Sequence, residues 1–415
     1  MEFKKYAIGL SLVALSSTSL MAGASPKLVV SGSTVICGST INQRNKTSGK
    51  GGGIPAISIG SSDLYFRALA QTEGGFEYKL VMNINAVPYA NKDAAIDRSY
   101  LEFGSNTMGT LQVGAVSGVD DTMAKGGLSL IGGAAGIDGT FPGAYNMSSG
   151  VNGGVHLLGY TKRANKLSYT TPSFYGFQAG ISFTPNTSNA GRMRDYSKAN
   201  VPGIGNDSGI YVDKELAAYG LANTALGLTY NNTWDDYTFG LSLVGITERS
   251  RLNGQEGPIR VRNLRSFQIG ALVGYKDFRV ASSYFDNGKS RLPYESNQLL
   301  KTSGANQFRT TDLNEGNAGK AWDVAAQYTM GAYQFSAGYF ETLRKVNNTS
   351  KARSQVVTLT ADYKALPGLK LFVEADFARS GNTQAALNQS NAMKRDTGIG
   401  RNSGNAFVGG TKISF

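Results

Sequence analysis

The chain has 415 residues, a formal net charge of +12, 53 glycines and one cysteine. One cysteine excludes an intrachain disulfide framework, and one cysteine with one histidine excludes a cluster of transition-metal ligands. A basic excess of this size favours nucleic acid, an anionic membrane surface or an anion-attracting pore, and the sequence has no nucleic-acid-binding motif that would support the first of these partners.

The first 24 residues predict a secretory signal peptide. Two lysines precede an apolar run from Tyr6 to Leu15, and residues 22–24 (Ala-Gly-Ala) form a small-x-small cleavage site before Ser25. The apolar run is too short to span a membrane as a helix. We therefore expect a signal peptide over 1–24 and an exported chain over 25–415.

No later apolar run approaches the about 18 residues that a membrane helix needs, which excludes a helical membrane protein. Instead, alternation with period two predicts about sixteen β-strands. The predicted strands are 27–41, 57–71, 76–86, 96–104, 109–117, 166–171, 177–184, 225–232, 237–247, 266–275, 278–285, 321–329, 333–343, 355–364, 369–377 and a last strand after Gly404.

The connectors between these strands alternate strictly between short and long. Short turns on one side and long loops on the other are typical of a transmembrane antiparallel up-and-down β-barrel, with the turns in the periplasm and the loops outside. The predicted fold class is therefore all-β. An even number of strands places both chain ends on the periplasmic side.

The alternation also assigns the two faces of many strands. In the strand over 355–364, Val357 and Leu359 oppose Thr358 and Thr360. We expect the apolar set to contact lipid or a neighbouring subunit and the polar set to line a wet interior, because a dry core would strand buried charge. At about sixteen strands the barrel is wide enough for an aqueous channel.

The last ten residues, 406–415, read as a strand that ends in Phe415. Such a strand would pair with the first one, so that no backbone edge faces lipid. The ending is similar to the terminal-Phe assembly signal that the barrel-assembly machinery recognises. It predicts the cell outer membrane as the location and makes Lys412 and Ser414 lumenal.

Several stretches resemble the trimeric general-diffusion porins of Gram-negative outer membranes. They are Lys166–Phe183 (KLSYTTPSFYGFQAGISF), Arg98–Gly104 with Gly109–Gly114, Leu366–Gly368 and Gly409–Phe415. The resemblance covers nearly all of 25–415. It implies a water-filled channel for passive diffusion of ions and small hydrophilic solutes, a homotrimer latched through the second loop (87–95), and contact with outer-membrane lipid and lipopolysaccharide.

The resemblance also implies that the third loop, 118–165, folds into the barrel as a constriction loop. The Pro-Glu-Phe-Gly-Gly motif of enteric members is absent from it, which leaves open which loop residues reach the pore. Opposed rows of charge across the pore would screen solutes by charge and dipole. The expected loop residues are Asp120, Asp121 and Asp138, and the expected wall residues are Arg67, Arg98 and Lys166.

Other functions have less support in the sequence. His156 is the single histidine, so we expect no catalytic residues, no cofactor and no metal site. A substrate-specific outer-membrane channel would need an aromatic path along the lumen, yet of the aromatic residues mainly Phe340 and Phe372 have the inward parity. A barrel-type surface adhesin would place its functional residues in the loops rather than in a polar interior. Both classes remain alternatives to the general-diffusion porin.

Overall fold

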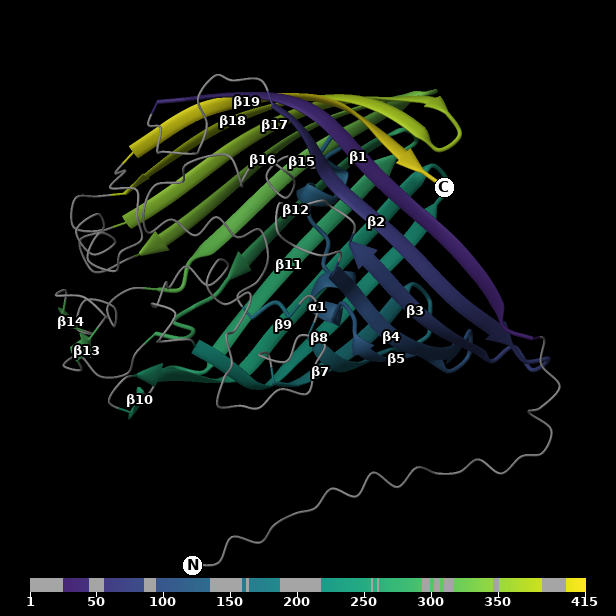
Figure 1. Ribbon diagram of the computed structural model, residues 1–415, viewed down its shortest axis with the longest axis horizontal. Helices are drawn as coiled ribbons and strands as arrows, with labels where there is room; N and C mark the ends of the chain where they lie inside the picture. Colours follow the sequence, from purple (N-terminus) through teal and green to yellow (C-terminus); the bar gives the residue numbers. More distant parts are fainter. Residues whose placement is uncertain are drawn as a thin grey trace, which may run out of the picture.

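Sixteen antiparallel strands of the computed structural model close into one barrel (Figure 1). The structure describes residues 25–44, 56–85, 95–134, 159–161, 164–186, 218–254, 257–259, 261–292, 299–301, 307–309, 317–345, 351–382 and 401–415. The predicted signal peptide and Asp138 lie outside these residues. No helix in the described part of the chain is long and apolar enough to cross a membrane.

The barrel strands follow one another around the wall in chain order. They are β1 (Lys27–Gln43), β2 (Ala56–Gln71), β3 (Glu77–Asn85), β4 (Ala95–Ser105), β5 (Gly109–Ala115), β6 (Asn165–Thr170), β7 (Phe177–Asn186), β8 (Ala218–Trp234), β9 (Tyr237–Gly254), β11 (Leu264–Tyr275), β12 (Phe278–Asp286), β15 (Lys320–Met330), β16 (Tyr333–Lys345), β17 (Lys351–Leu366), β18 (Leu369–Asn382) and β19 (Arg401–Ser414).

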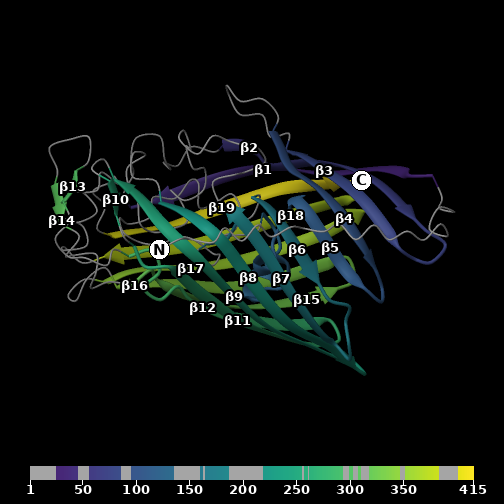
Figure 2. The ribbon, with the colours of Figure 1, turned by 90° about the horizontal axis from the view of Figure 1, so that it is seen from below.

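Five short elements lie outside this ring of sixteen. Strand β10 (Gly257–Ile259) pairs with the end of β9, and β13 (Leu299–Lys301) pairs with β14 (Gln307–Arg309) in a separate hairpin. The helix α1 (Val119–Thr122) and the 3₁₀ helix η1 (Gly127–Leu130) belong to the connector between β5 and β6. Figure 2 shows the barrel from below, with its strands running obliquely around the wall.

The first and last strands close the barrel. Strands β1 and β19 pair from Ser33 opposite Ser414 to Gln43 opposite Gly404. Beyond this ladder, the backbone N–H and C=O of Gly32 and Phe415 exchange two hydrogen bonds of 3.0 Å. Each of the sixteen strands therefore has two partners, which leaves no strand edge to face lipid.

The predicted alternation of short and long connectors is confirmed. Seven short turns gather at one end of the barrel, which we call the turn end, and the long connectors leave the other, the loop end (Figure 1). In two of the tightest turns a non-glycine residue has a positive φ, 49° at Asp235 and 51° at Lys276. Two-residue turns with this backbone match the twist of a hairpin and fix its register.

The predicted faces are confirmed as well. On β17 the side chains of Val357 and Leu359 are exposed on the outside, whereas Thr358, Thr360 and Asp362 are buried on the inside. The other strands repeat this pattern, with the apolar residues outward. Such a surface is stable only against lipid or another protein, because water would leave a broad apolar band unburied.

Several strands extend farther toward the loop end than the alternation predicts. Strand β8 begins at Ala218 instead of 225, β9 ends at Gly254 instead of 247, and β18 ends at Asn382 instead of 377. Near this end both faces carry polar or small residues, such as Arg379 and Ser380 on β18. Ladder pairing continues there without a hydrophobic alternation that would reveal it in the sequence.

The interior also contains an apolar cluster that the alternation alone does not reveal. Inward side chains of Val244, Leu264, Phe285 and Phe340 are buried and belong to one cluster with Val119 and Met123 of the β5–β6 connector. Part of the inner wall is therefore a packing surface for that connector. The polar positions occupy the rest of the wall, so the interior is less uniformly polar than the sequence predicts.

Candidate functional site

Residues 116–134, which we call the inward segment, lie inside the barrel and follow its inner wall. Their backbone N–H groups donate to side chains on the inner faces of β7, β9, β15, β16, β17 and β18, in that order. The donor and acceptor pairs are Val119 to Ser182 (2.8 Å), Lys125 to Ser242 (3.0 Å), Gly127 to Asp323, Gly132 to Ser336 (2.9 Å), Gly133 to Asp362 (2.9 Å) and Ala134 to Glu374 (2.7 Å).

These acceptors explain how an irregular segment is stable inside a barrel. A buried backbone N–H without a partner costs free energy, and a segment with little helix has many such groups. Asp323, Asp362 and Glu374 are each at most 3% exposed, and a carboxylate accepts stronger hydrogen bonds than a neutral group. The wall acids therefore attach the segment to strands that lie about 200 residues away in sequence.

Glycines let the inward segment approach the wall closely. A Cβ atom at Gly127 would lie 2.6 Å from the backbone nitrogen of Ala325, and Gly133 has a φ of 61°. On the wall, a Cβ atom at Gly227 would lie 2.7 Å from the sulfur of Met123. The reason why this connector is rich in glycine becomes clear only when the facing strands of the wall are known.

Oppositely charged side chains gather where the inward segment leaves β5 and where the connector returns to β6. The Lys166 ammonium is buried and donates to the backbone oxygens of Val116 (2.6 Å) and Thr161 (2.5 Å). The carboxyl of Asp120 is close enough to interact electrostatically with Lys166. From its buried position, Lys166 therefore links the beginning and the end of the connector between β5 and β6.

Burial dominates the electrostatics at Asp120. Desolvation raises the pKa of the Asp120 carboxyl to about 6, and the Lys166 charge opposes this shift. The hydroxyl of the neighbouring Tyr160 donates a hydrogen bond to the carboxylate of Asp121, and burial raises the pKa of Tyr160. The charge of Arg98 reaches both Lys166 and Tyr160. The structure thus brings Arg98, Asp120, Asp121 and Lys166 together in one place, which we call the loop-base cluster.

Arg67 and Phe415 lie outside this cluster, and Arg98 is at its exposed edge. Arg67 on β2 donates to Ser31 Oγ (2.9 Å), and its guanidinium carbon is 5.0 Å from the ring centroid of Tyr65. Arg98 Nε lies 3.8 Å from Asp97 Oδ2, and about a quarter (26%) of the Arg98 side chain is exposed. Phe415 is 72% exposed on the outside of β19.

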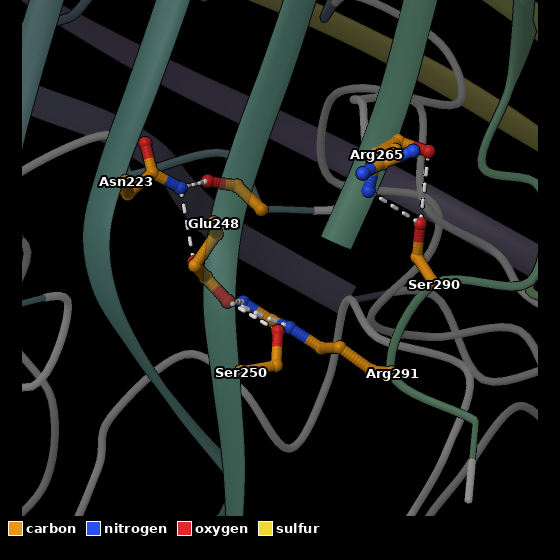
Figure 3. A network of polar contacts seen from close by, with 7 residues as sticks. Asn223, Glu248, Ser250, Arg265, Ser290 and Arg291 are labelled. Carbon is orange, nitrogen blue, oxygen red and sulfur yellow. Dashed lines mark hydrogen bonds and ion pairs between the residues drawn. The ribbon is translucent and has the colours of Figure 1, made fainter. Parts of the chain in front are cut away.

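A second polar network secures the returning part of the connector (Figure 3). Glu248 on β9 is buried and accepts two hydrogen bonds from the guanidinium of Arg291, at 2.6 and 3.1 Å. Asn223 Nδ2 on β8 donates to both Glu248 Oε2 and the backbone oxygen of Gly159, each at 3.0 Å. A Cβ atom at Gly220 would lie within 1.9 Å of the Glu248 carboxyl carbon, so glycine provides the space for this acid.

Neither set of anchoring residues is predicted from the sequence. Asp362 and Glu374 show the polar parity of their strands, which assigns them to the inner face but not to a partner. Glu248 and Arg291 are far apart in sequence, and Arg291 lies in a loop without periodicity. Parity could identify the acids as lumenal, but their partners follow only from the path of the connector.

The chain is similar to porins at the level of both family and fold. The family model for Gram-negative porins matches residues 10–383. Uncharacterised proteins of Rickettsia prowazekii and Rickettsia typhi are each 26% identical over 242 residues, which is 52% of this chain and 50% of theirs. The chain thus spans about half the length of the curated relatives it matches.

Solved porin structures share the fold at low sequence identity. The anion-selective porin from Comamonas acidovorans is 13% identical, with a TM-score of 0.56 over 94% of this chain and 100% of that chain. OmpF of Salmonella typhi is 13% identical, with a TM-score of 0.56 over 94% of this chain and 98% of that chain. OmpT of Vibrio cholerae in its trimer form has a TM-score of 0.55 at 12% identity, over 94% of this chain and 100% of that chain.

The family match covers most of the sequence. The observed fold agrees with it, because the first and last strands pair to close the barrel and a segment folds inward. The chain belongs to the Gram-negative porin family, whose members are non-enzymatic channels of the outer membrane.

Proposed function

We propose that this porin forms a water-filled channel for passive diffusion of ions and small hydrophilic solutes across the outer membrane. The observation that carries the proposal is the closed barrel of sixteen strands with the inward segment attached to its inner wall. A barrel of this size leaves an aqueous channel unless something fills it. The inward segment narrows the channel without replacing it by a continuous core.

We place the constriction between the inward segment, at Asp120 and Asp121, and the wall of β2 and β4, at Arg67 and Arg98. In this proposal Arg67 and Arg98 provide positive charge on the wall, and Asp121 and Asp138 provide negative charge on the loop. Lys166 is buried, and its charge acts on the passage through Asp120. The partial exposure of the Arg98 side chain (26%) supports its contact with solutes. Opposed charges across a narrow passage orient water and solute dipoles, which screens solutes by charge.

We propose that three copies assemble into a homotrimer through the outer faces of β1 and β19. Two outward glycines face each other at the barrel seam, where Gly38 pairs with Gly409. Small residues let a neighbouring backbone approach closely. Chemical cross-linking of the purified protein should give a trimer.

Export and assembly complete the proposal. Residues 1–24 would be removed as a signal peptide, and Phe415 would serve as the assembly signal read by the barrel-assembly machinery. The loop end would then face the outside of the cell and the turn end the periplasm. N-terminal sequencing of the mature protein from outer membranes should begin at Ser25.

A substrate-specific channel is less consistent with the wall. The inward rings of Phe285, Phe340 and Phe372 are each at most 4% exposed, because they are packed in apolar clusters. Tyr65 and Tyr100 share the inner face with Arg67 and Arg98 and are partly exposed. Two partly exposed rings at one level of the wall do not form a path along which a sugar or peptide slides. No described feature favours an adhesin.

Planar bilayers and liposomes test the proposed function. The purified protein should give large, weakly selective conductance steps in groups of three, and liposomes that contain it should swell in small neutral sugars at rates that fall with sugar size. A saturable conductance that one sugar or peptide blocks would instead identify a specific channel. Conductance and swelling equal to those of protein-free membranes would refute the channel.

A further inference from the structure

Three lysines lie side by side on the inner wall of the barrel, close to its turn end. Lys364 on β17 pairs directly with Lys370 on β18, and Lys370 pairs in turn with Lys412 on β19. The three strands are neighbours in the wall (Figure 1). Directly paired residues of adjacent antiparallel strands have Cβ atoms about 4.5–5.5 Å apart. The three ammonium groups, which we call the lysine row, are therefore close enough to share one small ligand.

Strand parity places the lysine row on the inner face of the wall. The residues that alternate with the three lysines point outward and are exposed, namely Tyr363, Leu371 and Ile413. Lys364 is exposed, and the side chains of Lys370 and Lys412 are partly exposed. Their ammonium groups are therefore accessible from the lumen.

The lysine row lies next to the inward segment, on its turn-end side. Asp362 on β17 accepts the hydrogen bond from the N–H of Gly133 at 2.9 Å, and Lys364 is the next inward residue of the same strand toward the turn. Two residues correspond to about 7 Å along a strand. The row therefore faces the part of the lumen that a solute enters after it has passed the inward segment from the loop end.

The positive charge of the row exceeds the negative charge beside it. Lys370 Nζ donates to Asp362 Oδ2 at 2.8 Å, and the other oxygen of this carboxylate accepts from Gly133. Among the residues that the structure describes, no carboxylate forms an ion pair with Lys364 or Lys412. Like charges directly opposite each other on neighbouring strands are destabilising. An anion bound between the three ammonium groups would offset this repulsion.

Two other cations on the inner face near the turn end have different surroundings. The ammonium of Lys79 on β3 lies 3.0 Å from a carboxylate oxygen of Glu77 and 3.0 Å from one of Glu102. Arg279 has the inward parity of β12, and its partners on the two neighbouring strands are uncharged. Lys79 is therefore neutralised and Arg279 stands apart, whereas the lysine row concentrates three cations at one place.

We propose that the lysine row binds a phosphate group, as inorganic phosphate or as the monoester of a small solute, at the turn end of the lumen. A phosphate dianion has enough oxygens to accept a hydrogen bond from each of the three ammonium groups, and lysine binds phosphate as a point charge. A chloride ion or a single carboxylate would neutralise only one of the three charges. This inference rests on the proposed channel and deepens it, because it names a class of solute.

The test is phosphate binding by the full-length folded protein in detergent, measured by equilibrium dialysis with radiolabelled inorganic phosphate at about pH 8, where phosphate is mostly a dianion. Wild-type protein is compared with the row variant Lys364→Gln/Lys412→Gln. The matched control, Lys79→Gln/Arg279→Gln, removes two inward cations near the same end but outside the row. The competitors are unlabelled phosphate, a sugar phosphate, its parent sugar and chloride. In planar bilayers, the chloride conductance of each protein is titrated with phosphate.

The row variant should bind phosphate at least about tenfold more weakly than wild type, because two of the three charges are lost, whereas the control should stay within about twofold. Displacement of the label by the sugar phosphate would extend the site to phosphate monoesters, and its failure would restrict the site to inorganic phosphate. Equal affinity of wild type and row variant, or an equal loss in the control, would overturn the proposal. Displacement by the parent sugar, or by chloride as effectively as by phosphate, would overturn it as well.

Dialysis separates this inference from the proposed function, because it requires no current. In bilayers, the chloride conductance of wild type should fall to a plateau as phosphate is added, and the row variant should need about tenfold more phosphate for the same decrease. A protein that conducts but binds phosphate equally well without the row would contradict the inference alone. A protein that binds phosphate through the row but does not conduct would contradict the channel alone.

Discussion

At the scale of single residues, Asp120 is a buried acid whose protonation state changes the charge of the proposed passage. Its carboxyl is 7% exposed and belongs to the loop-base cluster with Lys166, Asp121 and Arg98. Because burial raises its pKa to about 6, the charge of Asp120 changes between pH 7.5 and pH 5, where an ordinary aspartate stays ionised.

We therefore predict that the channel becomes more anion-preferring as the pH falls from 7.5 to 5. Protonation of Asp120 removes a negative charge beside Arg98 and Lys166, so the local potential becomes more positive. The reversal potential in a salt gradient measures this change. Asp120→Asn should have the same selectivity at pH 7.5 and pH 5, equal to that of the wild-type protein at pH 5. If the selectivity of this variant still changes with pH as much as that of the wild type, the assignment is contradicted.

The same pKa shift gives the sign of a stability effect. The folded state binds the Asp120 proton more tightly than the unfolded chain, since the folded pKa lies above the ordinary aspartate value of 3.8. The contribution of this group is therefore most favourable below pH 4 and is lost as the pH rises through 6.

The Glu248–Arg291 pair gives a second prediction for single residues. Both side chains are buried, so Glu248→Gln leaves a guanidinium without its charged partner and should destabilise the barrel by about 3–5 kcal/mol. The double variant Glu248→Met/Arg291→Met should recover much of this loss, because it removes both charges. Unfolding in denaturant with a folded-barrel gel assay measures the effect, and additive losses would argue against a coupled pair.

At the scale of elements, the inward segment depends on close contact with the wall. A Cβ atom at Gly127 would collide with the backbone of β15 and would displace the N–H that bonds Asp323. Gly127→Ala should therefore destabilise the segment by about 1–3 kcal/mol and raise both the conductance and the open-channel noise.

Gly245→Ala is the matched control for this prediction. Gly245 lies on β9, and a Cβ atom there would meet only the backbone oxygen of Ser266, at 3.8 Å. Single-channel recordings compare the two variants. Equal conductance and noise in Gly127→Ala, Gly245→Ala and wild type would show that the segment does not limit the passage.

The strands could be predicted from the sequence better than their inner contacts. Alternation through residues such as Val357 and Thr358 defines strand and face at once, because a half-exposed membrane strand must alternate. The alternation fails at Arg379–Asn382, where both faces lie in polar surroundings. It also gives no partner for Asp362 or Glu374, because their partners are backbone groups of a segment without periodicity.

At the scale of the whole molecule, closure depends on the pairing of β1 with β19. Phe415 extends this pairing by two hydrogen bonds with Gly32, and its ring covers Gly32 so closely that a Cβ atom there would lie 2.9 Å from the ring. We predict that Phe415→Ala lowers the yield of assembled barrel in outer membranes and has little effect on the conductance of the channels that do form.

Heat-modifiable migration on gels measures the folded fraction in this experiment. Phe407→Ala is a control on the same outer face of β19 that leaves the end of the chain unchanged. An equal loss of folded protein in both variants would indicate a packing defect and would argue against an assembly signal at Phe415.

In the proposed function, the inward segment narrows a continuous aqueous channel. The most direct measurement is the single-channel conductance of wild-type protein and of a variant in which a short Gly-Ser linker replaces residues 119–134, each verified as a folded barrel on gels. We predict conducting channels for both, with a clearly larger conductance and weaker charge selectivity in the variant. Equal conductance in the two proteins would contradict this role of the inward segment, and no conductance in either would contradict the channel.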